Sequence, residues 1–137
     1  MIDELIVRLN LFGFYTQAYA DDVAILANAL CLKVVREFLE QALRIVTQWC
    51  SDNNLVCKPE KTEIVLFTTK TGSHKRSRNE LETEEPRSKL ALEVNFDGAV
   101  IQTKSEVKYL GVTLDKILNW NSHLKRMINR AMSSLFV

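Results

Sequence analysis

The chain has 137 residues, of which 47% are hydrophobic and 26% charged, and its formal net charge is +1. This composition predicts one packed domain, or a piece of a larger one, and excludes a chain that is disordered as a whole. The overall charge favours neither nucleic acid nor an anionic membrane as a partner. No apolar run approaches the roughly 20 residues of a membrane span, and the acidic start does not resemble a signal peptide. We therefore expect a soluble intracellular protein, nuclear or cytoplasmic, with no membrane partner.

The cysteines and histidines give no pattern that is typical of a metal site. Cys31, Cys50 and Cys57 are odd in number and form no C-x-x-C pair, and His74 and His123 stand alone. Reduced and mostly buried thiols are therefore predicted in preference to a zinc site or a disulfide framework.

Hydrophobic periodicity predicts short alternating elements in the first half of the chain. In chain order these are a helix over 3–11, strands over 14–20 and 23–27, a helix over 30–51 and a strand over 63–67. Asp21 and Asp22 separate the first two strands, so we expect a hairpin with this acidic pair at or beside its tight turn. The second helix has the clearest amphipathic pattern and is expected to lie across a sheet.

The second half begins with a polar segment and then returns to regular elements. Residues 68–89 hold one large apolar residue and a basic run at 74–78, which indicates a flexible surface insertion. After it we predict strands over 90–96, 99–102 and 107–114, the first two joined by Asp97-Gly98, and a closing amphipathic helix from Trp120. Strands mostly joined by hairpins, with helices between them, predict an antiparallel sheet backed by helices, which is the α+β class.

The pair Asp21-Asp22 allows two interpretations. Aspartate is common in turns because its side chain accepts hydrogen bonds from the local backbone, and this role alone would explain the pair. Neighbouring carboxylates also repel each other by roughly 1–4 kcal/mol at contact, and a divalent cation would convert this repulsion into coordination. Such hard oxygen ligands suit Mg²⁺, which binds one or two carboxylates together with water and substrate phosphates.

Three motifs follow one another along the chain. The first is Tyr19-Ala20-Asp21-Asp22 within QAYADDVAIL, the second runs from Trp49 through 59–63 into an apolar strand, and the third is 109–115 with Trp120 and His123. In this order they resemble the Tyr-x-Asp-Asp hairpin, the next motif, and the primer-grip hairpin with the first thumb helix of reverse transcriptases. The first motif is most similar to non-LTR (LINE-type) retrotransposon enzymes. The resemblance covers nearly the whole chain except the insertion.

The resemblance implies roles at the acidic pair and near it. Asp21 would be a ligand of the catalytic Mg²⁺ ions, and Asp22 a weaker or more distant partner. Lys61 would lie near the phosphates of the incoming dNTP, although a solvated loop cation is an alternative for this residue. Polymerisation in the family uses two metal ions, which hold the attacking and the leaving oxygen.

The resemblance also implies contacts with the RNA template and the DNA primer. Primer-binding residues would be Tyr19, Tyr109, Leu110, Gly111 and Val112, and weaker contacts with the nucleic-acid backbone would come from Lys125, Arg126 and Arg130. Tyr109 could also be an ordinary strand residue, and a basic helix face is often only solvated. Trp49 and Trp120 are predicted to be core anchors, since they belong to apolar stripes.

Residues 1–118 are thus predicted to be a partial reverse-transcriptase palm, with 68–89 as an insertion, and 119–137 the start of the thumb. The family's third catalytic carboxylate, its fingers and its nucleotide-binding helix lie upstream of the hairpin, where this chain offers only Asp3 and Glu4. We therefore expect a polymerase fragment that binds Mg²⁺ weakly and is inactive alone. The alternative is a non-catalytic α+β module that binds RNA or a protein partner. The apolar edge of the hairpin over 14–27 also predicts self-association.

Overall fold

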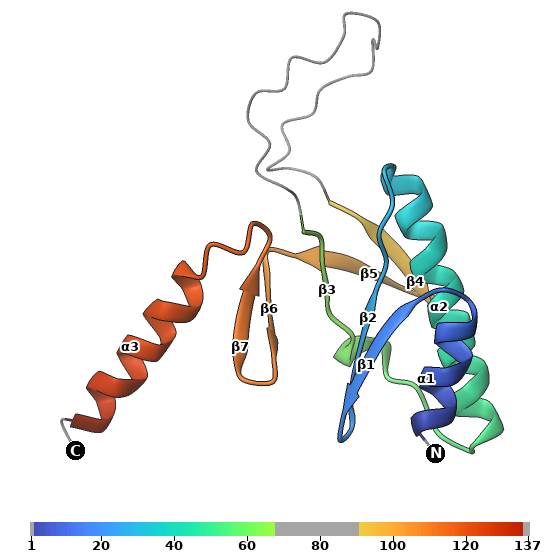
Figure 1. Ribbon diagram of the computed structural model, residues 1–137, viewed down its shortest axis with the longest axis horizontal. Coiled ribbons are helices and arrows are strands. Elements are labelled where there is room, and N and C mark those ends of the chain that lie inside the picture. Colours follow the sequence, from blue (N-terminus) through green and yellow to red (C-terminus); the bar gives the residue numbers. More distant parts are fainter. Residues whose placement is uncertain (1, 68–90, 136–137) are drawn as a thin grey trace, which may run out of the picture. The chain divides into compact units, whose positions relative to one another are not determined.

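The structure is a computed structural model that describes residues 2–67 and 91–135 (Figure 1). Its elements are α1 (Ile2–Leu11), β1 (Tyr15–Tyr19), β2 (Asp22–Leu26), α2 (Leu32–Asp52), the 3-10 helix η1 (Pro59–Lys61), β3 (Ile64–Val65), β4 (Glu93–Phe96), β5 (Ala99–Lys104), β6 (Glu106–Tyr109), β7 (Val112–Asp115) and α3 (Asn121–Leu135). The mixture of helices and mainly antiparallel strand pairs confirms the predicted α+β class. The predicted insertion at 68–89 lies outside the described residues.

The chain divides into two compact units, Met1–Thr62 with Leu92–Gln102 and Glu63–Ala91 with Thr103–Val137. In the first unit, α1 lies beside α2 and against β1 (Figure 1). Leu5 and Leu9 of α1 pack with Phe14 and with Ala42 and Trp49 of α2 in one buried cluster. Their spacings of four and seven residues place each pair on one helix face, so the helical periods of the sequence account for this core.

Helix α1 ends in a glycine cap at Gly13. Gly13 has a φ of 85°, and the N–H groups of Gly13 and Phe14 donate to the carbonyls of Asn10 and Leu9 at 2.9 and 3.2 Å. This left-handed residue turns the chain from α1 into β1, and glycine adopts the conformation without steric strain. As a result Phe14 enters the core directly after the helix.

The hairpin of β4 and β5 turns at Asp97-Gly98, as predicted. Both residues have a left-handed φ, 51° and 82°, and Phe96 lies opposite Ala99, which is the pattern of a type I′ turn. Within its three-stranded sheet β4 is the outer strand, next to β5. The carboxylate of Glu40 on α2 accepts the outward N–H of Asn95 at 3.2 Å, so α2 covers this edge.

Residues 107–114, predicted as one strand, form a hairpin instead. β6 and β7 pair in an antiparallel register with Tyr109 opposite Val112, and the chain turns at Leu110 and Gly111, whose φ values are 47° and 84°. Because leucine occupies a turn position where a polar residue is usual, the apolar pattern continues through the reversal and hides it. The hairpin agrees with the resemblance and corrects the interpretation from periodicity.

Within residues 2–67 and 91–135 the strands form three small sheets in place of the one sheet that was predicted. β3 is two residues long, shorter than the predicted 63–67, and it pairs with β5 in parallel, with Ile64 opposite Thr103. Residues Pro59–Lys61 form η1 just before it, with Pro59 in the first turn, where the absence of an N–H is tolerated. A parallel partner that lies far away in the sequence cannot be recognised from local patterns.

In the second unit, α3 packs against β7. The N–H of Thr113 donates to Nδ1 of His123 at 3.3 Å, and Arg126 forms an ion pair with Glu106 at 3.3 Å. Trp49 is a core residue as predicted, but Trp120 is 46% exposed, so its prediction as a core anchor was wrong. Trp120 precedes the helix with a φ of 64°, and this conformation separates it from the helical stripe on which the prediction rested. No helix among the described residues is long and apolar enough to cross a bilayer.

The start of α3 depends on the charge of Asp115. Its carboxylate accepts backbone N–H groups of Ile117 at 3.0 Å and of Asn119 and Trp120 at 3.2 Å. Desolvation raises the pKa of this carboxyl, but the hydrogen bonds from the backbone outweigh it and hold the pKa below its ordinary value of 3.8. Because the pKa of Asp115 is lower in the folded chain than in the unfolded chain, its carboxylate stabilises the folded form at pH values above the ordinary pKa. This stabilisation is lost as the pH falls through the pKa of the folded form.

We therefore expect the amide resonances of Ile117 and Asn119 to lose their native chemical shifts in a titration that runs below pH 3.8. In Asp115→Asn the side-chain oxygen still accepts hydrogen bonds but carries no charge. The amide chemical shifts of Ile117 and Asn119 should therefore differ less from those of an unfolded chain, and they should not change with pH over this range. The same titration curve in both proteins would contradict the role of the carboxylate.

Candidate functional site

The acidic pair lies at the tip of a tight hairpin. β1 and β2 pair from Tyr15 opposite Leu26 to Tyr19 opposite Asp22, which leaves Ala20 and Asp21 as the two turn residues. The predicted hairpin is therefore present, although Asp22 belongs to β2 and not to the turn. Ala20 has a φ of 54°, a left-handed conformation that costs a residue with a Cβ about 1–2 kcal/mol. Strain of this kind at a non-glycine residue supports a functional role for the tip.

The two faces of this hairpin differ because side chains alternate along a strand. Thr16 is buried, and Ile25 opposite it packs against the core of the first unit. The other face carries Tyr15 and Tyr19, which are 61% and 67% exposed, and Asp22 lies opposite Tyr19 on that face. The core contacts hold the hairpin, and its free face presents Tyr19 opposite the carboxylate of Asp22, with Tyr15 at the far end of the strand pair.

Lys61 lies in the same unit, as the last residue of η1. Its N–H donates to the carbonyl of Lys58 at 3.0 Å, and its side chain is exposed. Among the described residues no hydrogen bond or ion pair joins Lys61 to Asp21 or Asp22. The structure therefore gives this lysine a fixed backbone position and no contact with the acidic pair.

The donor set at the tip fits a partial magnesium site. Asp21 and Asp22 are exposed, acceptor-only side chains on adjacent residues, which suits an ion that keeps several waters. Within the described part of the chain no group of three or more His, Cys, Asp or Glu side chains could hold a metal ion. Two metal ions held between an attacking and a leaving oxygen need ligands that converge from more than one element. The residues present therefore fit one weakly held ion and do not complete a two-metal centre.

The predicted primer-binding segment from Tyr109 to Val112 forms the tip of the second hairpin, in the second unit. Leu110 is exposed and Tyr109 is half-buried. Leu110 adopts its left-handed φ although it has a branched side chain, so this tip is strained in the same way as the tip at Ala20. Two hairpin tips thus carry the predicted catalytic and primer-binding residues, one in each unit.

The three predicted backbone-contacting cations lie on α3 and are exposed. Arg126 is paired with Glu106, a partner that the sequence did not indicate, because the two residues lie on different elements. Lys125 and Arg130 have no ion pair within the described residues. These two side chains keep their full charge available for another molecule.

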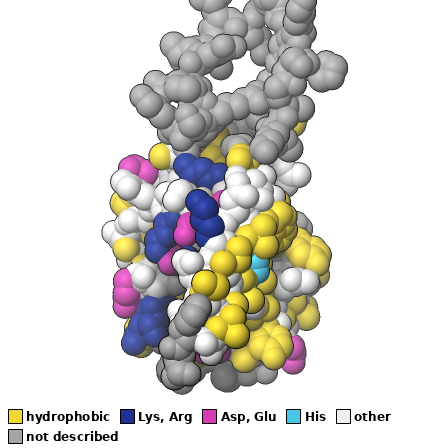
Figure 2. All heavy atoms as spheres, turned by 90° about the vertical axis from the view of Figure 1, so that its left-hand side faces the viewer, with side chains coloured by type: hydrophobic (Ala, Val, Ile, Leu, Met, Phe, Trp, Pro, Cys, Tyr) yellow, Lys and Arg dark blue, Asp and Glu magenta, His cyan; other side chains and the backbone are white. Residues whose placement is uncertain are grey.

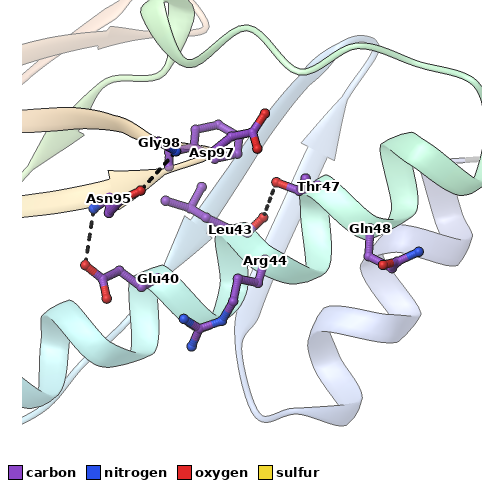
Figure 3. Close-up of a pocket in the computed structure, with 9 residues that line it drawn as sticks. Glu40, Leu43, Arg44, Thr47, Gln48, Asn95, Asp97 and Gly98 are labelled. Atoms are coloured by element: carbon purple, nitrogen blue, oxygen red, sulfur yellow. Dashed lines mark hydrogen bonds between the residues drawn. The ribbon is translucent and has the colours of Figure 1, made fainter.

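A groove of about 650 Å³ lies between α2 and the β4–β5 turn (Figure 3). Two of the hydrogen bonds among the residues that line it involve Asn95. The N–H of Asn95 donates to the carboxylate of Glu40, and the N–H of Gly98 donates to the side-chain oxygen of Asn95. In Figure 3 the Arg44 side chain points away from the turn. No sequence pattern predicts this groove because its two walls are about fifty residues apart, and no predicted site residue lines it. It is a packing feature of the first unit.

The cysteines are free thiols, Cys31 exposed and Cys50 and Cys57 half-buried, so the prediction of mostly buried side chains was wrong for Cys31. Burial and the adjacent Cys50 thiol raise the pKa of Cys57 to about 12. This thiol therefore stays protonated at neutral pH and is a poor nucleophile or metal ligand.

Comparison with known proteins agrees with the motifs at the two tips. The sequence profile of the family described as reverse transcriptase (RNA-dependent DNA polymerase) matches residues 1–114. The chain belongs to the reverse transcriptase family. The match includes both hairpins with their predicted site residues, and it ends before α3.

The relatives of the chain come from mobile elements. It is 34% identical over 112 residues to the probable RNA-directed DNA polymerase from transposon BS of Drosophila melanogaster, covering 82% of the chain and 11% of that protein. It is 28% identical over 106 residues to the RNA-directed DNA polymerase from mobile element jockey of the same species, covering 77% and 10%. It is 26% identical over 126 residues to the Retrovirus-related Pol polyprotein from type-1 retrotransposable element R1 of Bradysia coprophila, covering 90% and 11%.

These matches confirm the predicted kinship with a reverse transcriptase of a non-LTR retrotransposon. No solved structure matches the chain significantly. The chain spans about a tenth of the length of the curated relatives that it matches.

Proposed function

We propose that this chain is the part of a retrotransposon RNA-directed DNA polymerase that holds the acidic tip of the palm and the start of the thumb. Residues 1–118 are assigned to the palm and 119–137 to the thumb. One observation carries the proposal. Within the segment that matches the family, Tyr19-Ala20-Asp21-Asp22 forms a strained two-residue turn whose carboxylates are exposed. RNA template, DNA primer and dNTP are the ligands of the intact enzyme.

At this tip, Asp21 is the main Mg²⁺ ligand and Asp22 the weaker one. A bound ion supplies positive charge that stabilises the phosphoryl group during transfer. Tyr19, exposed on the same face as Asp22, packs near the primer end. Lys61 provides a positive charge for the phosphates of the dNTP, and its exposure on η1 supports this role.

The second tip holds the primer terminus. Gly111 lets the backbone approach the primer closely, since no heavy atom lies within 4 Å of the position where a Cβ would stand. Leu110 and Val112 flank it, and Tyr109 supports the turn from β6. On α3, Lys125 and Arg130 contact the nucleic-acid backbone, and Arg126 contributes only when it leaves Glu106.

The carboxylates from one turn hold a single ion weakly, so the chain alone does not polymerise. In a titration of the full chain with Mn²⁺, we expect broadening of the amide resonances around Asp21 and Asp22, with a dissociation constant of about 10⁻³ M. Mg²⁺ should compete, and Asp21→Asn should abolish the effect. Asp3→Asn, which removes an exposed carboxylate of α1, is the matched control and should leave it unchanged.

Primer extension on an RNA template by the same purified chain should give no product. Extension that is lost in Asp21→Asn would show that the chain is a complete enzyme and would overturn this part of the proposal. If Mn²⁺ does not bind at the tip, the metal role is refuted, and the alternative of a non-catalytic module that binds RNA or a protein partner is favoured.

The free edge of the β1–β2 pair supports a further part of the proposal. Among the described residues β1 and β2 pair only with each other, so the outer edge of β2 presents unpaired backbone groups. We expect self-association through this edge, seen as a sedimentation coefficient that rises with protein concentration. A constant monomer value across the concentration range would contradict it.

A further inference from the structure

A histidine lies at the joint between α3 and the β6–β7 hairpin. His123 belongs to the first turn of α3, is half-buried, and accepts the backbone N–H of Thr113 on its Nδ1 at 3.3 Å. Its ring meets the indole of Trp120 edge to face, with 6.5 Å between the ring centroids. Figure 2 shows hydrophobic side chains around the small visible part of a histidine side chain, coloured cyan, and His123 is the only histidine among the described residues.

The N–H of Thr113 needs this acceptor because it points away from its own hairpin. The pair of residues that closes a two-residue turn exchanges hydrogen bonds, and the pair after it directs its N–H groups outward. Tyr109 and Val112 close the turn, so Thr113 belongs to the next pair. Because Thr113 is 1% exposed, water has little access to its N–H. The packing of α3 on β7 therefore depends on the acceptor that His123 supplies.

This hydrogen bond defines the protonation state of the ring. A backbone N–H can only donate, so Nδ1 of His123 carries no hydrogen and the imidazole is neutral, with its hydrogen on Nε2. In the imidazolium form both nitrogens carry hydrogen, and neither orientation of the ring offers an acceptor. Protonation would therefore set two donors against each other and leave the N–H of Thr113 without a partner.

The charged groups on the elements around His123 do not compensate for a positive ring. The Asp115 carboxylate of β7 accepts backbone N–H groups of the residues just before α3. On β6, Glu106 is paired with Arg126, which lies one turn after His123 on the same side of the helix. The other charged residues of these strands, of α3 and of the loop between them are cations, namely Lys108, Lys116, Lys125 and Arg130. The amino end of a helix also carries partial positive charge, which disfavours an imidazolium in the first turn.

We propose that His123 is a proton-operated latch, which holds α3 on the β6–β7 hairpin in its neutral form and releases the helix when the imidazole is protonated. Histidine is the side chain that ordinarily changes its charge between about pH 5 and 8. Because the docked helix holds the neutral ring, acid shifts the equilibrium toward the released helix, by up to about tenfold per pH unit for one proton. The Asp115 carboxylate loses its charge only at lower pH, so the two steps are distinct.

The latch acts next to the tip that is proposed to hold the primer terminus. Thr113 directly follows Val112, the last residue of that segment, so release of α3 frees the outer edge of β7 beside the tip. Acid therefore loosens the start of the thumb from the hairpin. The latch is measured on the chain without nucleic acid, so its failure can be distinguished from the failure of the primer-binding role.

The test follows the full chain by nuclear magnetic resonance between about pH 8 and pH 5. In the parent chain the Thr113 amide resonance should shift with the same midpoint as the ring protons of His123. The transverse relaxation of the backbone amide nitrogens of α3 should slow at low pH relative to that of β6 and β7, because a released helix tumbles more freely. His74→Asn, which removes the other histidine of the chain, should behave like the parent.

Two substitutions of His123 separate the acceptor from the proton. His123→Asn places an amide oxygen close to the position of Nδ1 and does not titrate, so α3 should stay docked at both pH values. His123→Phe keeps an aromatic ring beside Trp120 but has no acceptor, so α3 should be released at both pH values. The comparison of the parent with His123→Asn decides the point even if His123→Phe does not fold.

Three results would overturn the latch. The first is α3 relaxation that stays constant in the parent while the His123 ring titrates. The second is a transition that persists in His123→Asn, because another group would then control the helix. The third is a helix held more firmly at low pH, since the imidazolium would then have taken Glu106 or Asp115 as its partner.

Discussion

Replacing Leu9 by alanine is expected to lower the free energy of unfolding by about 3–5 kcal/mol. Leu9 is 0% exposed and packs with Leu5, Phe14, Ala42 and Trp49 in the cluster that joins α1, the start of β1 and α2. The substitution removes three buried carbon atoms and leaves a cavity. The cavity can close only if two helices and a hairpin move toward one another. Since small domains are stable by only about 5–15 kcal/mol, this one change removes a large part of the total.

Urea denaturation followed by far-ultraviolet circular dichroism measures the effect. Val7→Ala is the matched control, because Val7 lies on the same helix but is 57% exposed, and its effect should stay within about 0.5 kcal/mol. Equal losses in the two variants would show that α1 contributes only its helical propensity and that the cluster around Leu9 is not the core of the first unit.

The elements that the sequence predicted well are those set by local patterns. The amphipathic pattern of α2 and the turn at Asp97-Gly98 can each be recognised from residues that are close together in the sequence. Both elements are found where they were expected. The hairpin at Leu110-Gly111 was hidden because a leucine stands in a turn. The parallel pairing of β3 with β5 joins residues about forty apart, so no local window contains it.

The candidate site follows the same division. The turn with Asp21 and Asp22 could be predicted because two polar residues between apolar strands favour a hairpin on local grounds. The position of Lys61 relative to Asp21 and Asp22 depends on how α2 and the loop after it pack. The spacing of residues in the sequence does not predict this packing. The pattern of α3 likewise predicted an amphipathic helix, but an apolar stripe looks the same in a sequence whether a core or a partner covers it.

The substitution Thr113→Val is expected to raise the free energy of unfolding of the second unit by about 1–3 kcal/mol. Thr113 in β7 is 1% exposed, and its Oγ1 has no hydrogen-bond partner within the described residues. Its backbone N–H donates to Nδ1 of His123. A buried hydroxyl without a partner loses its hydrogen bonds to water on folding and forms no hydrogen bond in the folded state, which lowers stability. Valine has nearly the same shape, keeps the backbone hydrogen bond and favours a strand.

Thr47→Val is the matched control for this prediction. Thr47 is half-buried in α2, and its Oγ1 donates to the carbonyl of Leu43 at 3.1 Å, so the same chemical change removes a hydrogen bond that is made. We expect Thr47→Val to leave stability unchanged or to lower it by about 1 kcal/mol. Thermal unfolding of the two variants beside the parent chain decides the point. A lower melting temperature in Thr113→Val would mean that its hydroxyl has a partner in solution, and that the packing of α3 on β7 depends on a polar contact at this residue.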